Sequence, residues 1–188
     1  MQMKKTLLAI VLATLAVIPT MAAAEQEQSN ARTAVEKFSG HCPIAETVDA
    51  EGQPVLLWQH VFEDGSHDLA MARTQQGRLG DIHRVTFGGS RQAGCHYHGL
   101  ALARGGDWGW HLAWALDKVE PGKAALRYAR MDGAAWVSSP AKRFGGDSAH
   151  APRLQVDGEN ITLQWRETVD GREVERSASS VDGGRSWN

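Results

Sequence analysis

The sequence predicts an all-β protein made of three repeats, each folded as a four-stranded blade of a partial β-propeller. Three observations lead to this prediction: a repeat of about 54 residues, short apolar segments separated by turn residues, and 20 glycines in 188 residues. Beyond the N-terminal segment, helical periodicity never continues for more than about three turns. A period near 50 with several strands per unit is typical of propeller blades rather than solenoid coils.

The composition is that of a globular domain, with 42% hydrophobic and 22% charged residues and a formal net charge of −2. This balance excludes an intrinsically disordered chain. It also lacks the basic excess of a nucleic-acid-binding surface, so no nucleic-acid partner is expected.

The N-terminus has the pattern of a secretory signal peptide. Lys4 and Lys5 precede an apolar run at residues 7–18, which is followed by the small residues 22–24. The run is too short to cross a bilayer, so the protein is not expected to be membrane-embedded. We expect a signal peptide at residues 1–24, cleavage near Ala24, and a periplasmic or secreted mature domain.

Three landmarks recur along the rest of the chain. Histidines that begin each repeat are separated by 55 and 54 residues, central tryptophans by 56 and 51, and alanines of the third strand by 57 and 49. These landmarks are His41, His96 and His150, then Trp58, Trp114 and Trp165, then Ala72, Ala129 and Ala178. The repeats are therefore expected at about residues 41–95, 96–149 and 150–188, with a possible closing strand at residues 32–39.

Turn residues divide the repeats into strands. Gly65, Gly158 and Gly171 each follow an aspartate, and glycine supplies the positive φ that a tight hairpin turn requires. Each of these pairs lies between segments of alternating or apolar residues, which predicts a β-meander.

The C-terminal segment matches the pattern S-x-D-x-G-x-x-W with Ser180, Asp182, Gly184 and Trp187. In such a turn the aspartate accepts backbone hydrogen bonds and the tryptophan packs against the blade. A shorter copy, from Asp132 to Trp136, lies at the corresponding point of the second repeat.

On these motifs the sequence resembles the sialidase-like β-propeller superfamily, whose bacterial neuraminidase repeat carries this Asp-box. The resemblance covers most of the mature chain and implies that the boxes are structural elements at the blade periphery. It also implies a possible activity, because family sialidases use three arginines to bind a carboxylate, a tyrosine nucleophile paired with a glutamate, and an aspartate as acid and base.

The sequence supplies these catalytic groups incompletely. The early Arg-Ile-Pro motif is absent, Tyr97 and Tyr128 are the two tyrosines, and Glu167 reads as a solvated strand residue. The recurring strand arginines are Arg73, Arg130 and Arg153. We therefore expect a non-catalytic module that binds a glycan or a protein. The alternatives are a sialidase-type glycoside hydrolase and a truncated remnant of a longer propeller protein.

Histidines and cysteines gather at the starts of the repeats, which in a propeller lie around the central channel. The candidate binding residues are His41, His96, His98 and His150. Cys42 and Cys95 have nearly the same register in adjacent repeats and are a candidate disulfide. Alternatively, Cys42, Cys95, His96 and His98 could hold copper or zinc, or the histidines serve only the loops and the thiols stay free. No cofactor is otherwise expected.

Trp108 is a further candidate binding residue, because a glycine-rich hairpin could present its ring to a sugar. Trp110 begins an apolar strand and is expected in the core. Three blades are too few to close a propeller. A head-to-tail homodimer forming a six-bladed ring is therefore a possible assembly.

Overall fold

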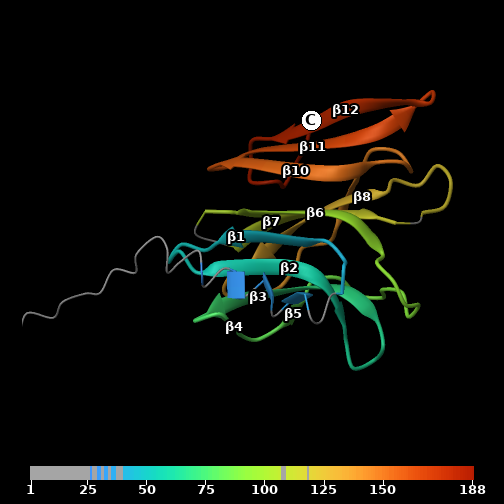
Figure 1. The fold of residues 1–188 in the computed structure, drawn as a ribbon. Helices are drawn as coiled ribbons and strands as arrows, with labels where there is room; N and C mark the ends of the chain where they lie inside the picture. Colours follow the sequence, from blue (N-terminus) through green and yellow to red (C-terminus); the bar gives the residue numbers. More distant parts are fainter. Residues whose placement is uncertain are drawn as a thin grey trace, which may run out of the picture.

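The computed structural model describes residues 40–106, 109–117 and 119–188, together with Gln26 and residues 29–30, 32–33 and 35–36. These residues form twelve strands in three antiparallel sheets. Each sheet comes from one repeat, and the sheets are stacked face to face in chain order, as Figure 1 shows. The predicted all-β, partial β-propeller architecture is confirmed.

The first sheet has five strands and the second has four. The first consists of β1 (Ile44–Val48), β2 (Pro54–Val61), β3 (His67–Gln75), β4 (Arg78–Leu79) and β5 (His83–Arg84), and both short strands pair with β3. The second consists of β6 (Tyr97–Arg104), β7 (Gly109–Leu116), β8 (Leu126–Asp132) and β9 (Lys142–Phe144). A fourth strand in two pieces thus replaces the single strand expected in the first blade.

The third sheet has three strands: β10 (His150–Asp157), β11 (Asn160–Val169) and β12 (Arg172–Ser180). Beside β12, the N–H of Asn188 donates to the carbonyl oxygen of Ser179 at 2.9 Å. Gly65, Gly158 and Gly171 have φ values of 76°, 57° and 73°. These values confirm the predicted hairpin turns.

The strand registers confirm two of the three landmarks of the repeat. Trp58, Trp114 and Trp165 lie opposite Ala70, Arg127 and Arg176, respectively. Two residues earlier, Leu56, Leu112 and Leu163 lie opposite Ala72, Ala129 and Ala178. The tryptophans and alanines are therefore equivalent residues of successive sheets.

The histidine landmark is shifted by one residue in the second repeat. Ile44 lies opposite Trp58 and Leu100 opposite Trp114, but His41 comes three residues before Ile44, whereas His96 comes four residues before Leu100. A β-bulge between Tyr97 and Gly99 interrupts the register there. Such a bulge cannot be recognised from residue spacing, because the extra residue only shifts the count.

Two apolar clusters hold the sheets together. Between the first and second sheets pack Val55, Leu57, Leu69, Met71, Val85, Tyr97, Trp110, Leu112, Trp114, Ala129 and Met131. Between the second and third pack Ala113, Ala125, Leu126, Tyr128, Ala149, Leu163 and Trp165. Trp110 is in the core, as predicted. Each central tryptophan faces the side of the preceding sheet.

The segment before the first sheet is not the closing strand expected at residues 32–39. Its described residues, 32–33 and 35–36, are helical. Arg32 and Glu36 form an exposed ion pair at helical spacing, 3.5 Å apart, and Val35 is fully buried in a third cluster with Leu56 and Trp58. One apolar residue between two charged ones suits an amphipathic helical turn, and here that turn covers the outer face of the first sheet.

The outer face of the third sheet is polar. Thr162 and Gln164 on β11 are half-buried, and Glu175 and Ser177 on β12 are exposed. A six-bladed ring of two chains would bring this face against the apolar outer face of another first sheet. The structure therefore does not support the head-to-tail homodimer. No helix among the described residues is long and apolar enough to cross a membrane.

The C-terminal motif forms the expected turn. The Asp182 carboxylate accepts hydrogen bonds from the N–H groups of Arg185 (2.9 Å) and Ser186 (2.8 Å) and from the hydroxyl of Ser180 (2.8 Å). Hydrogen bonds from Ser186 and Ser180 hold the pKa of Asp182 well below its usual range. Trp187 packs 4.7 Å from the ring of Tyr128 in the preceding sheet. The turn therefore fastens one sheet to the next.

The shorter copy in the second repeat makes the same kind of turn. Asp132 accepts hydrogen bonds from the N–H groups of Ala134 (2.9 Å) and Ala135 (2.7 Å). Trp136 then stacks on His83 of the first sheet with ring centroids 4.1 Å apart. Both aspartates therefore have structural roles and lie outside the candidate sites described below.

Candidate functional site

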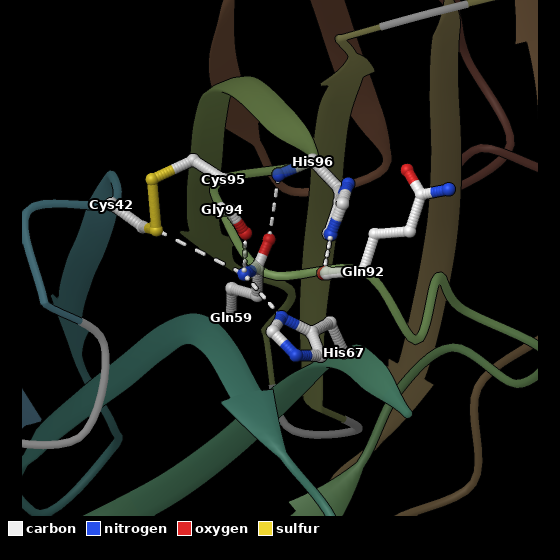
Figure 2. Close-up of a disulfide and its surroundings, with 7 residues drawn as sticks. All are labelled: Cys42, Gln59, His67, Gln92, Gly94, Cys95 and His96. Carbon is white, nitrogen blue, oxygen red and sulfur yellow. Dashed lines mark hydrogen bonds between the residues drawn. A yellow bond between two sulfur atoms is a disulfide. The ribbon is translucent and has the colours of Figure 1, made fainter. Parts of the chain in front are cut away.

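Cys42 and Cys95 are joined by a disulfide that connects the first two sheets (Figure 2). Gln59 holds the backbone on both sides of Cys95. Its Nε2 donates to the carbonyl of Gly94 at 2.8 Å, and its Oε1 accepts from the N–H of His96 at 2.8 Å. This is the pairing that the repeat register favours. Because the two sulfur atoms are bonded to each other, neither is a thiolate in this structure.

The four candidate histidines do not form one cluster. His41 lies beside Cys42 in a hollow near the helical turn. The Nε2 of His96 lies 2.8 Å from the carbonyl oxygen of Gln92, whereas His98 and His150 line a common cleft. No group of three or more metal-ligating side chains is found among the residues that the structure describes. Trp108 lies outside those residues.

The cleft that contains His98 and His150 lies between the second and third sheets and has a volume of about 440 Å³; we call it the second cleft. The Nε2 of His98 lies 2.5 Å from an oxygen of Asp117, and His150 lies 3.3 Å from Glu173. Asp147, also in the lining, accepts a hydrogen bond from the N–H of Gly122 at 3.0 Å. Bulges in β6 and β10 place the two histidines here.

A second space, which we call the first cleft, lies between the first and second sheets and has a volume of about 530 Å³. Aromatic and polar side chains line it together: Phe87, Tyr97, Trp114, Arg127 and Asp68. Phe87 is 75% exposed, which is unusual for a phenylalanine. Leu116 lines both clefts, so the two are neighbours along one end of the sheets.

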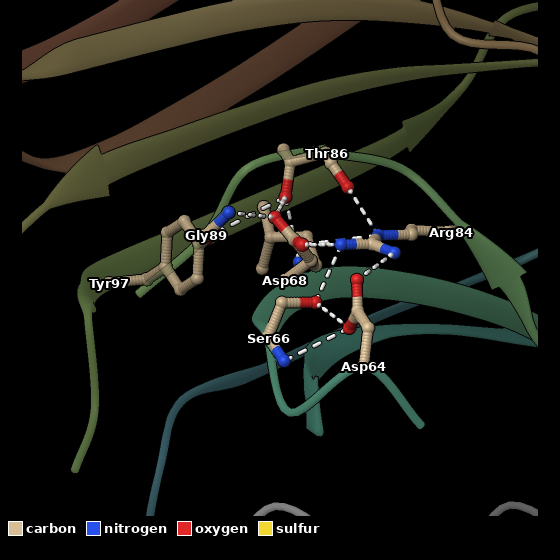
Figure 3. A network of polar contacts seen from close by, with 8 residues as sticks. Asp64, Ser66, Asp68, Arg84, Thr86, Gly89 and Tyr97 are labelled. Atoms are coloured by element: carbon tan, nitrogen blue, oxygen red, sulfur yellow. Dashed lines mark hydrogen bonds and ion pairs between the residues drawn. The ribbon is translucent and has the colours of Figure 1, made fainter. Parts of the chain in front are cut away.

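One wall of the first cleft is a network of polar contacts around Asp68, shown in Figure 3. Asp68 is fully buried, and one of its oxygens accepts hydrogen bonds from the Thr86 hydroxyl (2.9 Å) and the Gly89 N–H (3.0 Å). The other oxygen accepts from Arg84, whose Nε is 3.1 Å away. Arg84 also pairs with Asp64 at 3.2 Å. These donors satisfy the Asp68 carboxylate and fix the wall.

The charges in this wall stabilise one another. Hydrogen bonding to Asp68 raises the pKa of Arg84, and hydrogen bonds from Ser66 lower the pKa of Asp64 to about 2. The guanidinium of Arg84 also lies 4.6 Å from the ring centroid of Phe62 and 5.2 Å from that of Phe87. The exposed ring of Phe87 is therefore held in place by a cation–π contact.

Both tyrosines are buried and engaged within the fold. Tyr97 is 5% exposed, its hydroxyl lies 3.2 Å from that of Thr86, and burial raises its pKa. The hydroxyl of Tyr128 lies 2.6 Å from the Nδ1 of His111, and burial raises the pKa of Tyr128 as well. Burial, with a smaller effect of Arg130, lowers the pKa of His111 to about 4. His111 is therefore neutral at pH 7.

The three recurring strand arginines lie on three different sheets and do not form a common clamp. Arg73 on β3 pairs with Asp49 at 2.9 Å and covers the rings of Trp110 and Trp136. Arg130 is on β8. Arg153 on β10 is exposed and lies 3.9 Å from Glu175 on the polar outer face.

Glu167 is not the solvated residue expected from the sequence, because its side chain is only 12% exposed. It accepts hydrogen bonds from the N–H of Gly146 (3.0 Å) and from Arg176 (2.9 Å), and these contacts lower its pKa. Glu167 therefore links the third sheet to Gly146 of the second repeat.

Sequence reasoning missed Phe87, Asp68 and Arg127. One signal was available: the triplet Phe87-Gly88-Gly89 recurs as Phe144-Gly145-Gly146. Phe144 packs 6.1 Å from Trp165, whereas Phe87 is exposed. The two triplets are not in the same strand register: Arg84 and Arg143 pair with equivalent residues, so Val85 is the residue equivalent to Phe144.

No protein-family model matches the sequence, and no curated protein matches it. Among solved structures, the chain is similar to an α-L-arabinanase of Penicillium chrysogenum complexed with arabinobiose, with a TM-score of 0.53 and 11% identity over 77% of this chain and 47% of that chain. A family-43 endo-arabinanase of Bacillus licheniformis gives a TM-score of 0.47 and 14% identity over 76% and 52%. A fucose lectin of Kordia zhangzhouensis gives 0.42 and 12% over 78% and 96%.

The similarity to the Penicillium enzyme supports the β-propeller fold. It does not show the sialidase-like superfamily that the C-terminal motif resembles. The chain spans about half the length of the two arabinanases.

Proposed function

We propose that this protein is an exported, non-catalytic glycan-binding β-propeller module and that the first cleft is its binding site. One observation carries the proposal: a cleft of about 530 Å³ combines an exposed aromatic ring, Phe87, with polar groups such as Arg127. Sugars present an apolar ring face and a rim of hydroxyls, so they bind where aromatic surface and hydrogen-bonding groups occur together. The volume is within the usual range of small-molecule sites.

The chemistry of the cleft favours binding over catalysis. Glycoside hydrolases need two carboxyl groups at a defined separation on either side of the scissile bond. The carboxylate of Asp68 is fully buried and is bonded to Arg84, Thr86 and Gly89. Tyr97, the other candidate reactive group here, is buried with a raised pKa and is therefore a poor nucleophile at neutral pH.

Export is part of the proposal. The signal-peptide pattern at residues 1–24 supports it, with cleavage near Ala24 into the periplasm or the medium. The disulfide between Cys42 and Cys95 supports it independently, because structural disulfides persist mainly in oxidising compartments.

A glycoside hydrolase is the second candidate, and one observation favours it. The second cleft contains the carboxyl groups of Asp117 and Asp147, and His98 contacts Asp117. Two carboxyl groups in one cleft could serve as acid and base. In this case the second cleft, rather than the first, would be the active site.

A binding experiment separates the two. We would titrate the disulfide-bonded protein with an oligosaccharide panel that includes arabinobiose and methyl-fucoside, and assay the same panel for released sugar. We expect saturable binding without turnover, and Phe87→Ala should weaken binding at least about fivefold through lost stacking. Val181→Ala, at a residue 69% exposed on the C-terminal turn, is the matched control and should change nothing.

Two results would overturn the proposal. Absence of binding to every sugar of the panel would remove the glycan-binding function. Sugar release that Asp117→Asn abolishes, while Phe87→Ala leaves it intact, would establish the hydrolase at the second cleft instead.

A further inference from the structure

The two spaces between sheets are built on the same framework, which allows a residue-by-residue comparison. Trp165 lies opposite Arg176 in the third sheet, and the equivalent Trp114 lies opposite Arg127 in the second. Both arginines point toward the preceding sheet, as the tryptophans do. The contacts of Arg176 can therefore be compared directly with those of Arg127.

Arg176 has a carboxylate partner from its own sheet. Its Nε donates to Glu167 Oε1 at 2.9 Å, and Glu167 Oε2 accepts from the N–H of Gly146 at 3.0 Å and from the indole of Trp165 at 3.3 Å. Glu167 comes two residues after Trp165. The carboxylate thus lies in a prepared site made of a guanidinium, a backbone N–H and an indole N–H.

Arg127 lacks this partner. The residue two positions after Trp114 is Leu116, which lines the first cleft in the place where Glu167 lies in the third sheet. The Nη1 of Arg127 donates to the carbonyl oxygens of Ala124 and Leu126. Among the described residues, no hydrogen bond or ion pair is made by its Nε or Nη2, the edge that binds a carboxylate through two hydrogen bonds.

A second positive charge, that of Arg143, lies next to the unpaired charge of Arg127. Arg143 lies directly opposite Arg127 on the next strand, and like charges at this position destabilise a sheet. Burial and the charge of Arg143 lower the pKa of Arg127. Two adjacent cations, of which the half-buried Arg127 lines the cleft, favour an anionic ligand.

We infer that the first cleft binds a sugar with a carboxylate, a uronic acid residue, and that this carboxylate binds the Nε–Nη2 edge of Arg127 as Glu167 binds Arg176. The sugar ring then lies toward Phe87, the exposed copy of the Phe-Gly-Gly triplet. This inference rests on the proposed glycan-binding function and adds the ligand's charge. Its source is the difference between two equivalent sites of one chain.

The experiment compares an acid with its uncharged counterpart. We would titrate the protein with trigalacturonate and with its methyl ester, which retains the shape and removes the charge. The wild-type protein should bind the acid about tenfold to a hundredfold more tightly, the usual range for hydrogen bonds to charged groups. Arg127→Gln should remove this preference, so that the acid and the ester bind with equal affinity. Arg153→Gln, on the exposed outer face, is the matched control.

A third variant supplies the missing carboxylate from the chain itself. Leu116→Glu copies the arrangement of the third sheet, so the new side chain should occupy Arg127. We expect loss of trigalacturonate binding with a melting temperature that does not fall. Arg127→Gln keeps the test valid even if Leu116→Glu fails to fold.

Each other outcome has a distinct meaning. Equal affinity for acid and ester would overturn the uronic acid inference while leaving the glycan-binding function in place. A preference for the acid that survives Arg127→Gln would overturn the assignment to Arg127. Absence of binding to both probes would overturn the inference, and the neutral sugar panel would then decide the proposed function separately.

Discussion

The two outer faces of the stack belong to the first and third repeats, which have the same strand pattern, and yet the two faces differ in chemistry. The outer face of the first sheet is apolar, and its residues Leu56, Trp58, Ala70 and Ala72 are buried in a cluster with Val35 of the helical turn. On the outer face of the third sheet, polar residues occupy the positions that face a following sheet in the first two repeats. These residues are Thr162, Gln164, Glu175 and Ser177.

The equivalent residues of the other sheets show how specific this change is. In the first sheet they are Val55, Leu57, Leu69 and Met71, and in the second they are His111, Ala113, Leu126 and Tyr128, all buried. These positions are therefore buried, and apolar except for His111, where a sheet follows, and they are polar and half-buried or exposed in the third sheet. Terminal units of repeat proteins need such a polar outer face for solubility. At the opposite end of the stack, a helical turn performs this function by covering apolar residues.

The largest expected effect concerns the covered apolar face. Trp58→Ala removes a fully buried indole from the cluster with Val35 and should lower the free energy of unfolding by about 3–5 kcal/mol. Gln164→Ala on the polar face should change it by no more than about 0.5 kcal/mol. Urea unfolding of both variants under non-reducing conditions measures the difference. Similar effects of the two substitutions would show that the two faces do not differ as described.

A smaller effect is expected for the disulfide, which links the first sheet to the second, whereas aromatic packing of Tyr128 and Trp187 links the second to the third. Replacing both Cys42 and Cys95 by serine should cost about 2–4 kcal/mol, because the disulfide closes a loop with a sequence separation of 53 residues. Reduction of the wild-type protein should give the same loss, and reductant should not affect the double variant. An unchanged free energy of unfolding would mean that apolar packing alone holds the first sheet in place.

Features that recur in the chain could be predicted from the sequence. The tryptophan and alanine landmarks identified the repeat, and the Asp182 turn has the predicted hydrogen bonds. The helical conformation of residues 32–33 and 35–36 could not be recognised, because a short apolar segment flanked by charges fits an edge strand equally well. The burial of Val35 against Trp58 favours the helical turn over a strand, and this tertiary contact cannot be read from the local sequence.

The candidate site was predicted less well, for a physical reason. Histidines at equivalent positions are a feature that the repeats share, whereas both clefts lie where the repeats differ. Leu116 stands in place of Glu167, and Phe87 is exposed two residues beyond Val85, which is the residue equivalent to Phe144. These differences acquire meaning only when strand pairing shows which residues face the same space. His98 and His150 line one cleft, and bulges rather than spacing bring them there.

The smallest expected change in stability, and the most direct test of the polar face, comes from giving the third sheet the residues of the first. The variant combines Thr162→Val, Gln164→Leu, Glu175→Leu and Ser177→Met. Each substitution is on the surface and should alter the free energy of unfolding by about 0.5 kcal/mol or less. Together they create an apolar patch of the kind that buries against a neighbour, so the variant should self-associate. Light scattering should give the mass of one chain for the wild-type protein and a multiple of it for the variant. A wild-type mass of two chains, with Gln164 and Ser177 protected from solvent in the dimer, would mean that the polar face is itself an interface. In that case both outer faces would be buried, one by the helical turn and the other by a second chain.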